Sequence, residues 1–305
     1  MEPVMSHDAL IIGGSYAGLN AAMQLARARR RVLVIDDNRP RNRFAARAHG
    51  VMGRDGVSGA DITAEARAQV AAYPTAAFRS VEVVDARRGA CGFDVTLADG
   101  TTATGRRLIL AYGVEDVLPD LPGLRERWGR TVLHCPYCHG YEIGGGPIGI
   151  LGAGPMSVHQ ALLIADWGQP VLFLNGKVEP DADQLRMLGK RGVIIEATPV
   201  VALEGSQPAL EGARLADGRL IPVRAVFVGP RIRQGSGLAE GLGCEIEDGP
   251  MGPILRVDEF RQTTVPGVYA AGDLARAMSN ITLASADGVM AGIGLHRSLI
   301  EEELA

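Results

Sequence analysis

The N-terminal part of the chain alternates short apolar runs with a glycine-rich turn and an alanine-rich stretch. Residues 9–12 are apolar, the turn 13–18 (GGSYAG) follows, and residues 19–28 favour a helix. A second strand-like run over residues 31–35, apolar from Val32 onward, ends in Asp36. Because short apolar runs bounded by turns are typical of buried strands, this order predicts strand, helix and strand, which is a βαβ unit.

The same order returns in the middle of the chain. An apolar run at residues 149–151 leads into the turn 152–157 (GAGPMS), an apolar stretch up to Trp167 and a further apolar run at 171–174. A second strand, helix and strand are therefore expected here. The chain is predicted to have an α/β fold in which a Rossmann-like, nucleotide-binding plan is used twice.

Two other regions carry strand and helix patterns. Residues 79–112 alternate in the manner of antiparallel strands, so a β-meander is expected after the first unit. The expected strands are 80–85, 93–97 and 107–111, with a turn at 98–100. Near the C-terminus, residues 264–273 predict a strand that runs into a Gly-Asp turn, and residues 285–300 favour a closing helix.

Composition limits the classes of protein that need to be considered. With 305 residues, 47% of them hydrophobic, the chain is long enough for about two domains. A formal charge of −4 without a dense basic block argues against nucleic-acid or membrane-surface binding. No apolar run approaches the ~18 residues that cross a bilayer, and the first residues lack a signal-peptide layout. We therefore expect a cytoplasmic protein that binds no membrane.

The first glycine-rich turn has the chemistry of a pyrophosphate site. Backbone N–H groups of such a turn, together with a helix N-terminus, meet phosphate oxygens, and an acid ending the next strand accepts hydrogen bonds from a ribose. Asp36 lies 23 residues after Gly13, close to the expected spacing of about 20. Ser15 replaces the middle glycine of the usual pattern. The turn is interpreted as a dinucleotide site rather than a plain tight turn.

Two of the four cysteines form a Cys-x-x-Cys pair flanked by histidines, in the sequence His134-Cys135-Pro136-Tyr137-Cys138-His139. This spacing lets two sulfurs close a small ring, and neighbouring imidazolium groups or a helix N-terminus lower a thiol pKa. A half zinc site and an inert buried pair are the alternatives, but no second Cys-x-x-Cys is present. The pair is predicted to be redox-active, with no metal bound.

With these motifs in place, the chain resembles the two-domain pyridine nucleotide-disulfide flavoproteins of the low-molecular-weight thioredoxin reductase type. The resemblance covers nearly the whole chain and rests on the two glycine turns, residues 111–113 (AYG), the cysteine pair and residues 264–273. It implies a discontinuous FAD-binding domain, residues 1–115 and 247–305. It also implies an inserted NAD(P)-type domain, residues 116–246, which carries the cysteine pair.

The resemblance also implies roles for individual residues. In that family the first turn holds the FAD pyrophosphate, and an aspartate matching Asp273 contacts the ribityl and pyrophosphate region. The expected FAD-binding residues are Gly13, Gly14, Ser15, Tyr16, Ala17, Gly18, Asp36, Asp37, Arg43, His49, Gly113, Gly272 and Asp273. The expected catalytic residues are Cys135, Cys138, His139 and His134. Cys138 is expected to face the flavin, and Cys135 the substrate.

Two departures from the thioredoxin reductase pattern affect the predicted activity. Those reductases carry an acid directly after the second cysteine, whereas this chain has His139, which can also move protons. They also carry an arginine-rich segment that grips the NADPH 2′-phosphate, whereas residues 175–177 are Asn-Gly-Lys. A Cys-x-x-Cys followed by histidine resembles the dithiol oxidases of the gliotoxin, holomycin and depsipeptide type.

The leading hypothesis is therefore an FAD-dependent dithiol oxidase that closes a disulfide in a small molecule and passes electrons through FAD to O2. The alternative is a disulfide reductase driven by NAD(P)H or ferredoxin and acting on a thioredoxin-like protein. The intact second glycine turn supports this alternative. A flavoprotein redox sensor without turnover is a third reading. Resemblance favours a homodimer.

Overall fold

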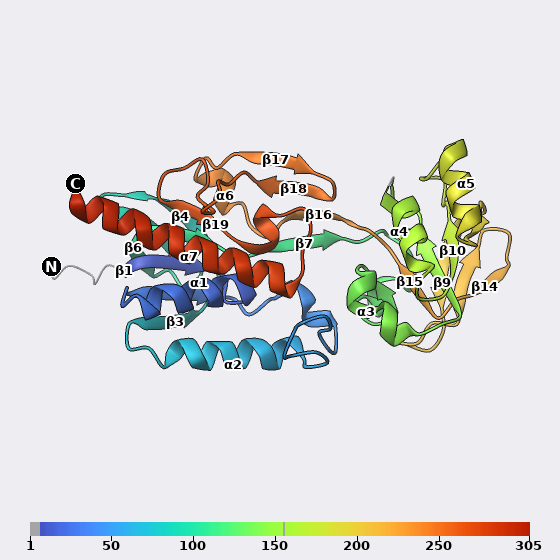
Figure 1. The fold of residues 1–305 in the computed structure, drawn as a ribbon, viewed down its shortest axis with the longest axis horizontal. Coiled ribbons are helices and arrows are strands. Elements are labelled where there is room, and N and C mark those ends of the chain that lie inside the picture. The colour runs from blue at the N-terminus through green and yellow to red at the C-terminus, as the bar shows by residue number, and fades with distance from the viewer. Residues whose placement is uncertain (1–6, 155) are drawn as a thin grey trace. The chain divides into compact units, whose positions relative to one another are not determined.

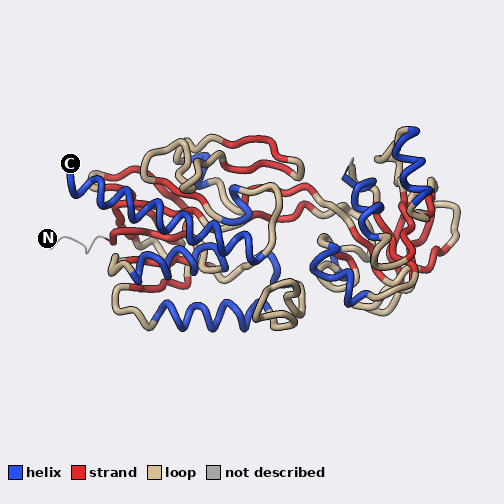
Figure 2. The backbone as a smooth tube through the Cα atoms, in the orientation of Figure 1, coloured by secondary structure: helices blue, strands red, loops and turns tan. Residues whose placement is uncertain are grey.

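The computed structural model describes residues 7–154 and 156–305. These residues form two compact units, each built around its own sheet (Figures 1 and 2). The first unit takes in the chain up to Arg43 together with Ala60–Glu115 and Ile232–Ala305, and the second takes in Phe44–Gly59 and Asp116–Arg231. No helix among the described residues is long and apolar enough to cross a bilayer.

The first unit contains a seven-stranded sheet in the order β3-β2-β1-β6-β5-β4, with β19 also paired to β6. Strands β1, β2, β3, β6 and β19 run parallel, whereas β4 and β5 form the antiparallel meander. The strands are β1 (His7–Ile12), β2 (Val32–Asp36), β3 (Ala76–Ser80), β4 (Val83–Gly89), β5 (Gly92–Leu97), β6 (Thr102–Leu110) and β19 (Val268–Ala270).

The helices and smaller strands of this unit cover and edge the sheet. They are α1 (Tyr16–Arg27), η1 (Arg41–Phe44), α2 (Gly59–Ala71), β7 (Val114–Val117), β16 (Arg231–Gln234), α6 (Leu238–Gly241), β17 (Ile246–Gly249), β18 (Gly252–Leu255), η3 (Gly272–Ala275) and α7 (Ile281–Leu304). Strands β7 and β16 pair with each other and carry the chain between the two units.

Strand β1 is apolar from Ala9 to Ile12 because both of its faces are buried there. Ala9 and Ile11 pack into the cluster that includes residues of α1 and α7, while Leu10 and Ile12 pack on the other side with the meander and α6. Successive side chains of a strand point to opposite faces, so a parallel strand covered on both sides needs apolar residues at every position. This explains the continuous apolar run in the sequence.

Helices α1 and α7 lie side by side on one face of this sheet (Figure 1). Their approach depends on Gly288 of α7, where a Cβ would come within 2.1 Å of the Ala17 carbonyl oxygen. A side chain at that position would push the helices apart, so glycine allows the two backbones to touch. The last segment of the chain is thereby fixed beside the helix that follows the first glycine-rich turn.

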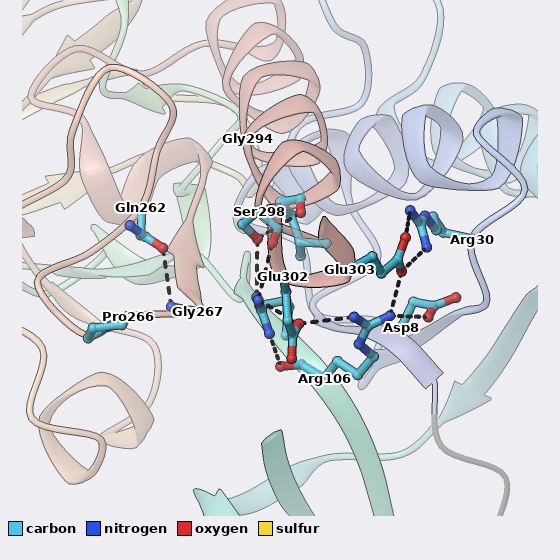
Figure 3. A network of polar contacts seen from close by, with 12 residues as sticks. Asp8, Arg30, Arg106, Gln262, Pro266, Gly267, Gly294, Ser298, Glu302 and Glu303 are labelled. Carbon is cyan, nitrogen blue, oxygen red and sulfur yellow. Dashed lines mark hydrogen bonds and ion pairs between the residues drawn. The ribbon is translucent and has the colours of Figure 1, made fainter. Parts of the chain in front are cut away.

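The C-terminal end of α7 is anchored by a network of ion pairs (Figure 3). Glu303 accepts hydrogen bonds from Arg30 at 2.7 Å and from Arg106 at 2.8 Å. Glu302 lies 3.0 Å from Arg106 and 2.9 Å from Arg107. Acidic side chains at a helix C-terminus face the negative end of the helix dipole, and the three arginines offset this repulsion.

Replacing Glu303 with glutamine is expected to lower stability in a pH-dependent way. Hydrogen bonds from Arg30 and then Arg106 lower the pKa of Glu303 from its ordinary value of 4.5 to about 2. The ionised carboxylate therefore stabilises the folded chain above pH 4.5, and this contribution is lost as the pH falls toward about 2. Denaturant midpoints of the wild type and E303Q, measured from neutral to acid pH, should differ near pH 7 and converge in acid.

The matched control is E301Q, which removes an exposed carboxylate whose ion pair within residues 7–154 and 156–305 is with Arg297 on the same helix. Exposed pairs of this kind contribute little to stability, so E301Q should lower the midpoint less than E303Q does. A difference between the wild type and E303Q that stayed constant down to acid pH would contradict the ionic role of Glu303.

The second unit contains a five-stranded parallel sheet in the order β11-β10-β9-β15-β8, beside a three-stranded antiparallel sheet, β12-β13-β14. Its strands are β8 (Val132–Leu133), β9 (Pro147–Leu151), β10 (Gln169–Phe173), β11 (Ile194–Glu196), β12 (Val200–Glu204), β13 (Gly212–Leu215), β14 (Leu220–Pro222) and β15 (Ala225–Phe227). Its helices are η2 (Arg125–Arg127), α3 (Pro136–Ile143), α4 (Met156–Ile164) and α5 (Ala182–Lys190). The predicted α/β fold with two Rossmann-like units is thus confirmed.

Three segments differ from the sequence expectations. Phe44–Gly59 was expected in the FAD-binding domain but groups with the second unit. Residues 232–246, expected with the inserted part, group with the first unit because Ile232, Leu238 and Cys244 pack in its core. The single strand expected at 80–85 is wrong: β3 ends at Ser80 and β4 begins at Val83. The chain turns between them, where the Val81 N–H donates to the Asp36 carbonyl.

Candidate functional site

The first glycine-rich turn is pinned where three parallel strands end. The Gly13 N–H donates to the Ile35 carbonyl, and the Ala111 N–H donates to the Ile12 carbonyl. Gly13 has a φ of 106°, and a Cβ there would lie 2.3 Å from the Ala111 carbonyl oxygen. A Cβ on Gly18 would lie 1.8 Å from the Gly13 oxygen. Only glycine fits these two buried positions, so the turn packs closely against the end of β6 and against its own backbone.

The turn leads into the N-terminus of α1 with donors available for an anion. Ser15 is the N-cap residue, and its side chain makes no capping hydrogen bond. The first N–H groups of a helix have no partner within the helix, and they lie at the positive end of its dipole. Tyr16 is held beside the turn because its hydroxyl accepts a hydrogen bond from the Asn42 amide at 2.9 Å.

Asp36 stands at the end of β2, directly over the turn. A Cβ on Gly14 would lie 2.9 Å from the Asp36 Cβ, so the carboxylate side chain packs on the glycine backbone. This is the arrangement in which an acid contacts the ribose next to a pyrophosphate. The glycine cradle, the free helix N-terminus and Asp36 together fit the adenosine diphosphate part of FAD.

Asp273 is paired with Arg41 rather than with Arg43, the neighbouring arginine that the sequence analysis chose as an FAD ligand. Arg41 donates to the Asp273 carboxylate at 2.8 Å and to the Ser279 hydroxyl at 3.0 Å. Arg43, the predicted ligand, is exposed, and its guanidinium donates to the backbone carbonyl of Pro40. Because arginines alternate in this short segment, the sequence alone does not show which of them points toward Asp273.

The other predicted FAD residues have the following places. Gly113 lies after the end of β6 and has a φ of 73°. Gly272 lies after the end of β19 and has a φ of 79°. A Cβ on Gly113 would meet nothing within 4 Å. Asp37 lies 3.7 Å from Arg39 at the surface. FAD contacts by these residues stay predictions.

The redox pair lies at the start of α3. Cys135 is the N-cap residue, Pro136 occupies the first turn, and Cys138 follows within the helix. The two cysteines form a disulfide across a Cα–Cα distance of 5.3 Å. When the disulfide opens, the thiols lie at the positive end of the helix dipole, which favours the thiolate. The free cysteines lie elsewhere, Cys91 exposed and Cys244 buried beside Thr263.

Helix α3 is seated on the rest of the second unit by close packing. A Cβ on Gly140 would lie 2.8 Å from the Trp167 ring, so glycine lets the helix rest on the indole. Tyr137 meets the same ring edge to face at 5.4 Å. The Gln160 amide of α4 donates to the His134 carbonyl at 2.9 Å, which fixes the backbone just before Cys135.

His139 follows Cys138 and is suited to act as a base. Burial lowers the pKa of His139 below its ordinary value of 6.5, nearby Glu142 raises it and His49 lowers it. The net shift is downward, so the imidazole is neutral at pH 7 and can accept a proton. No group of three or more candidate ligands among the described His, Cys, Asp and Glu residues is placed to hold a metal.

His49, expected near the flavin ring, is placed against α3. Its Nδ1 lies 3.3 Å from Glu142 Oε1 and 3.6 Å from Asp55 Oδ1, and its segment belongs to the second unit. A flavin contact by His49 stays a prediction. Glu142 was missed by the sequence analysis, although its position four residues after Cys138 puts it on the same face of a helix.

One backbone N–H of the second glycine-rich turn is bonded to a side chain of the same turn. The Ala153 N–H donates to the Ser157 hydroxyl at 3.0 Å, and Ser157 is buried. After β10, the Asn175 side chain accepts from the Val200 N–H at 3.0 Å, and Lys177 is exposed. Residue 155 of this turn lies outside the described residues. The described part offers a tight turn with one of its N–H groups already used.

Comparison with known proteins identifies the family. The model of the pyridine nucleotide-disulphide oxidoreductase family matches residues 7–288. Thioredoxin reductase tcpT of Claviceps purpurea is 34% identical, over 93% of this chain and 92% of that protein. An oxidoreductase from Agrobacterium tumefaciens is 48% identical with a TM-score of 0.93, over 97% of this chain and 99% of that one. The structure of HlmI is 38% identical with a TM-score of 0.91, over 98% of this chain and 94% of that one.

The chain therefore belongs to the pyridine nucleotide-disulphide oxidoreductase family. Within it, the chain is a thioredoxin reductase-like enzyme, which confirms the family resemblance and the prediction of an enzyme. The family binds FAD.

Proposed function

We propose that this enzyme is an FAD-dependent dithiol oxidase that forms a disulfide in a small molecule through Cys135 and Cys138. The observation that carries the proposal is a histidine with a lowered pKa directly after the second cysteine of a formed disulfide. An incoming dithiol has to lose a proton to become a nucleophile, because the thiolate is the species that attacks a disulfide. A neutral imidazole beside an oxidised pair is ready to take that proton.

The exchange balances within the described residues. A substrate thiol gives its proton to His139 while its sulfur attacks Cys135, and the Cys135–Cys138 bond breaks to leave a Cys138 thiolate. The second substrate thiol then displaces Cys135 and closes the substrate disulfide, and its proton passes to the departing Cys135 thiolate. The substrate loses two electrons and two protons, and the cysteine pair gains the two electrons. Bound FAD supplies the acceptor for these electrons, with O2 as the final oxidant.

Apart from His49, the residues assigned to FAD lie in the first unit. The turn from Gly13 to Gly18 and the N-terminus of α1 would bind the pyrophosphate, and Asp36 the adenosine ribose. The pairing of Asp273 with Arg41 would orient that carboxylate toward the remainder of the cofactor. In the second turn, by contrast, the Ala153 N–H already donates to the Ser157 hydroxyl. No arginine occurs in residues 174–180, which follow β10. This supports an oxidase that does not depend on NADPH.

The proposal is tested by anaerobic reduction of the bound flavin, followed by absorbance, with NADH, NADPH and dithiothreitol offered separately. The oxidase predicts fast bleaching by the dithiol alone and recovery of the flavin spectrum when air is admitted. Fast bleaching by NADH or NADPH, with slow reoxidation in air, would contradict it. A slow response to every donor, with a complex that forms in only one redox state, would point to a sensor.

A disulfide reductase is the second candidate function. It is favoured by the relative tcpT, whose name is thioredoxin reductase, and by the complete parallel sheet behind the second glycine turn. In that direction NAD(P)H or ferredoxin would feed the cysteine pair, which would reduce a thioredoxin-like protein. Cytoplasmic location and a homodimer are the remaining proposals. Light scattering of the purified protein would test the dimer.

A further inference from the structure

The segment that carries His49 is a closed, well-braced loop. The Ala48 N–H donates to the Val57 carbonyl at 2.8 Å, and the Gly56 N–H donates back to the Ala48 carbonyl at 2.9 Å. Within the loop, the Gly50 N–H donates to the Asp55 carboxylate at 2.8 Å. These bonds fix the backbone on both sides of His49, so its imidazole is held in one place rather than carried on a loose loop.

The loop places His49 against the acidic side chain of the redox helix. His49 Nδ1 and Glu142 Oε1 are 3.3 Å apart. Glu142 lies three residues after His139 and four after Cys138, so all three project from one side of α3. The Glu142 side chain is more exposed than that of His49: the exposed fraction is 39% for Glu142 and 17% for His49. The carboxylate therefore reaches water, whereas His139 is partly buried.

We propose that Glu142 and His49 are positioning residues for His139: Glu142, one helical turn away, takes the proton of the His139 imidazole to solvent, and His49 fixes the Glu142 carboxylate. The inference rests on the role of His139 in the proposed function. In the step concerned, a proton taken from a thiol moves from His139 to Glu142 and then to water. No electrons move, and Glu142 returns to its ionised form.

Glu142 and His49 act on the pKa of His139 in opposite directions. Glu142 on the same helix raises the pKa of His139, and His49 on the loop lowers it. Asp55 lies on the far side of His49, at 3.6 Å. Removing the charge of Glu142 should therefore move the titration of His139 to lower pH, and removing His49 should move it to higher pH. Opposite shifts would show that both charges act on His139, and the rate of disulfide reduction then decides whether they serve the proton transfer.

The experiment uses the purified holoenzyme with its disulfide intact and follows the histidine side chains by NMR as the pH is changed. The chain has six histidines, and H139Q assigns the resonance of His139. We compare E142Q and H49N with E179Q and H159N, which change an exposed acid and an exposed histidine of the same unit. In parallel, the rate of disulfide reduction by dithiothreitol is measured for each protein at pH 7.

The expected result is a lower midpoint in E142Q, a higher one in H49N and no change in the two controls. The rate with dithiothreitol should fall about tenfold or more in E142Q, at the modest end of general acid–base effects. An unchanged His139 midpoint in both variants would overturn the inference, and so would shifted midpoints with unchanged rates. If E142Q does not fold, H49N alone decides. Failure of the wild type to oxidise any dithiol in air would instead refute the proposed function, and the titration would still test the pair.

Discussion

Changing Cys138 to serine is expected to abolish reduction of the bound flavin by a small dithiol and to leave FAD binding intact. The remaining Cys135 has no partner with which to form the disulfide that the substrate attacks, and the other free cysteines are Cys91 and Cys244. Loss of a residue that forms the covalent intermediate typically lowers a rate by about three orders of magnitude or more. Anaerobic stopped-flow absorbance with dithiothreitol, together with the ratio of flavin to protein absorbance, measures both properties.

The matched control is C91S, which removes an exposed thiol outside the pair. It should reduce its flavin at the wild-type rate, because Cys91 lies on the turn between β4 and β5 in the first unit. Turnover that persists in C138S would refute the assigned mechanism, since the thiols would then reach the flavin without the disulfide. A C138S protein without FAD would show that Cys138 has a structural role.

The parts of the molecule that the sequence predicted well are those with local signals. The first βαβ unit could be predicted because an apolar run, a glycine turn and a helix-favouring stretch follow one another within residues 9–36. The cysteine pair could be predicted for the same reason, because a spacing of three residues lets the two sulfurs meet whatever surrounds them. In both places a few adjacent residues determine the local structure, and the rest of the fold packs around it.

The parts that the sequence missed depend on contacts between distant segments. Glu142 meets His49 across 93 positions of the chain, and Arg41 meets Asp273 across 232. No pattern near Arg41 distinguishes it from Arg43, because the choice is made by where the helix η1 turns its side chains. Helix α2 was not predicted either, since it has one buried residue and therefore only a weak apolar periodicity.

Changing Gly13 to alanine is expected to cost the protein both stability and its FAD. The φ of 106° disfavours any residue with a Cβ, and the new methyl group would lie 2.3 Å from the Ala111 carbonyl oxygen and 2.8 Å from the Tyr112 nitrogen. Both are backbone atoms at the end of a buried strand, so neither can move aside. Strain and overpacking together should cost about 3 kcal/mol or more. Thermal unfolding should shift down by roughly 6–12 °C, and the flavin-to-protein absorbance ratio should fall.

The control is a glycine-to-alanine change at another position of the second turn, G154A. Gly154 does not have a positive φ, and a Cβ there meets nothing within 4 Å. Alanine at a compatible position leaves stability unchanged or slightly raised, because it restricts the unfolded chain. G154A should therefore keep its FAD and its thermal midpoint, which separates the demands of the first turn from a general intolerance of alanine. Normal FAD content and stability in G13A would mean that the first turn is not the closely packed cradle that its backbone contacts indicate.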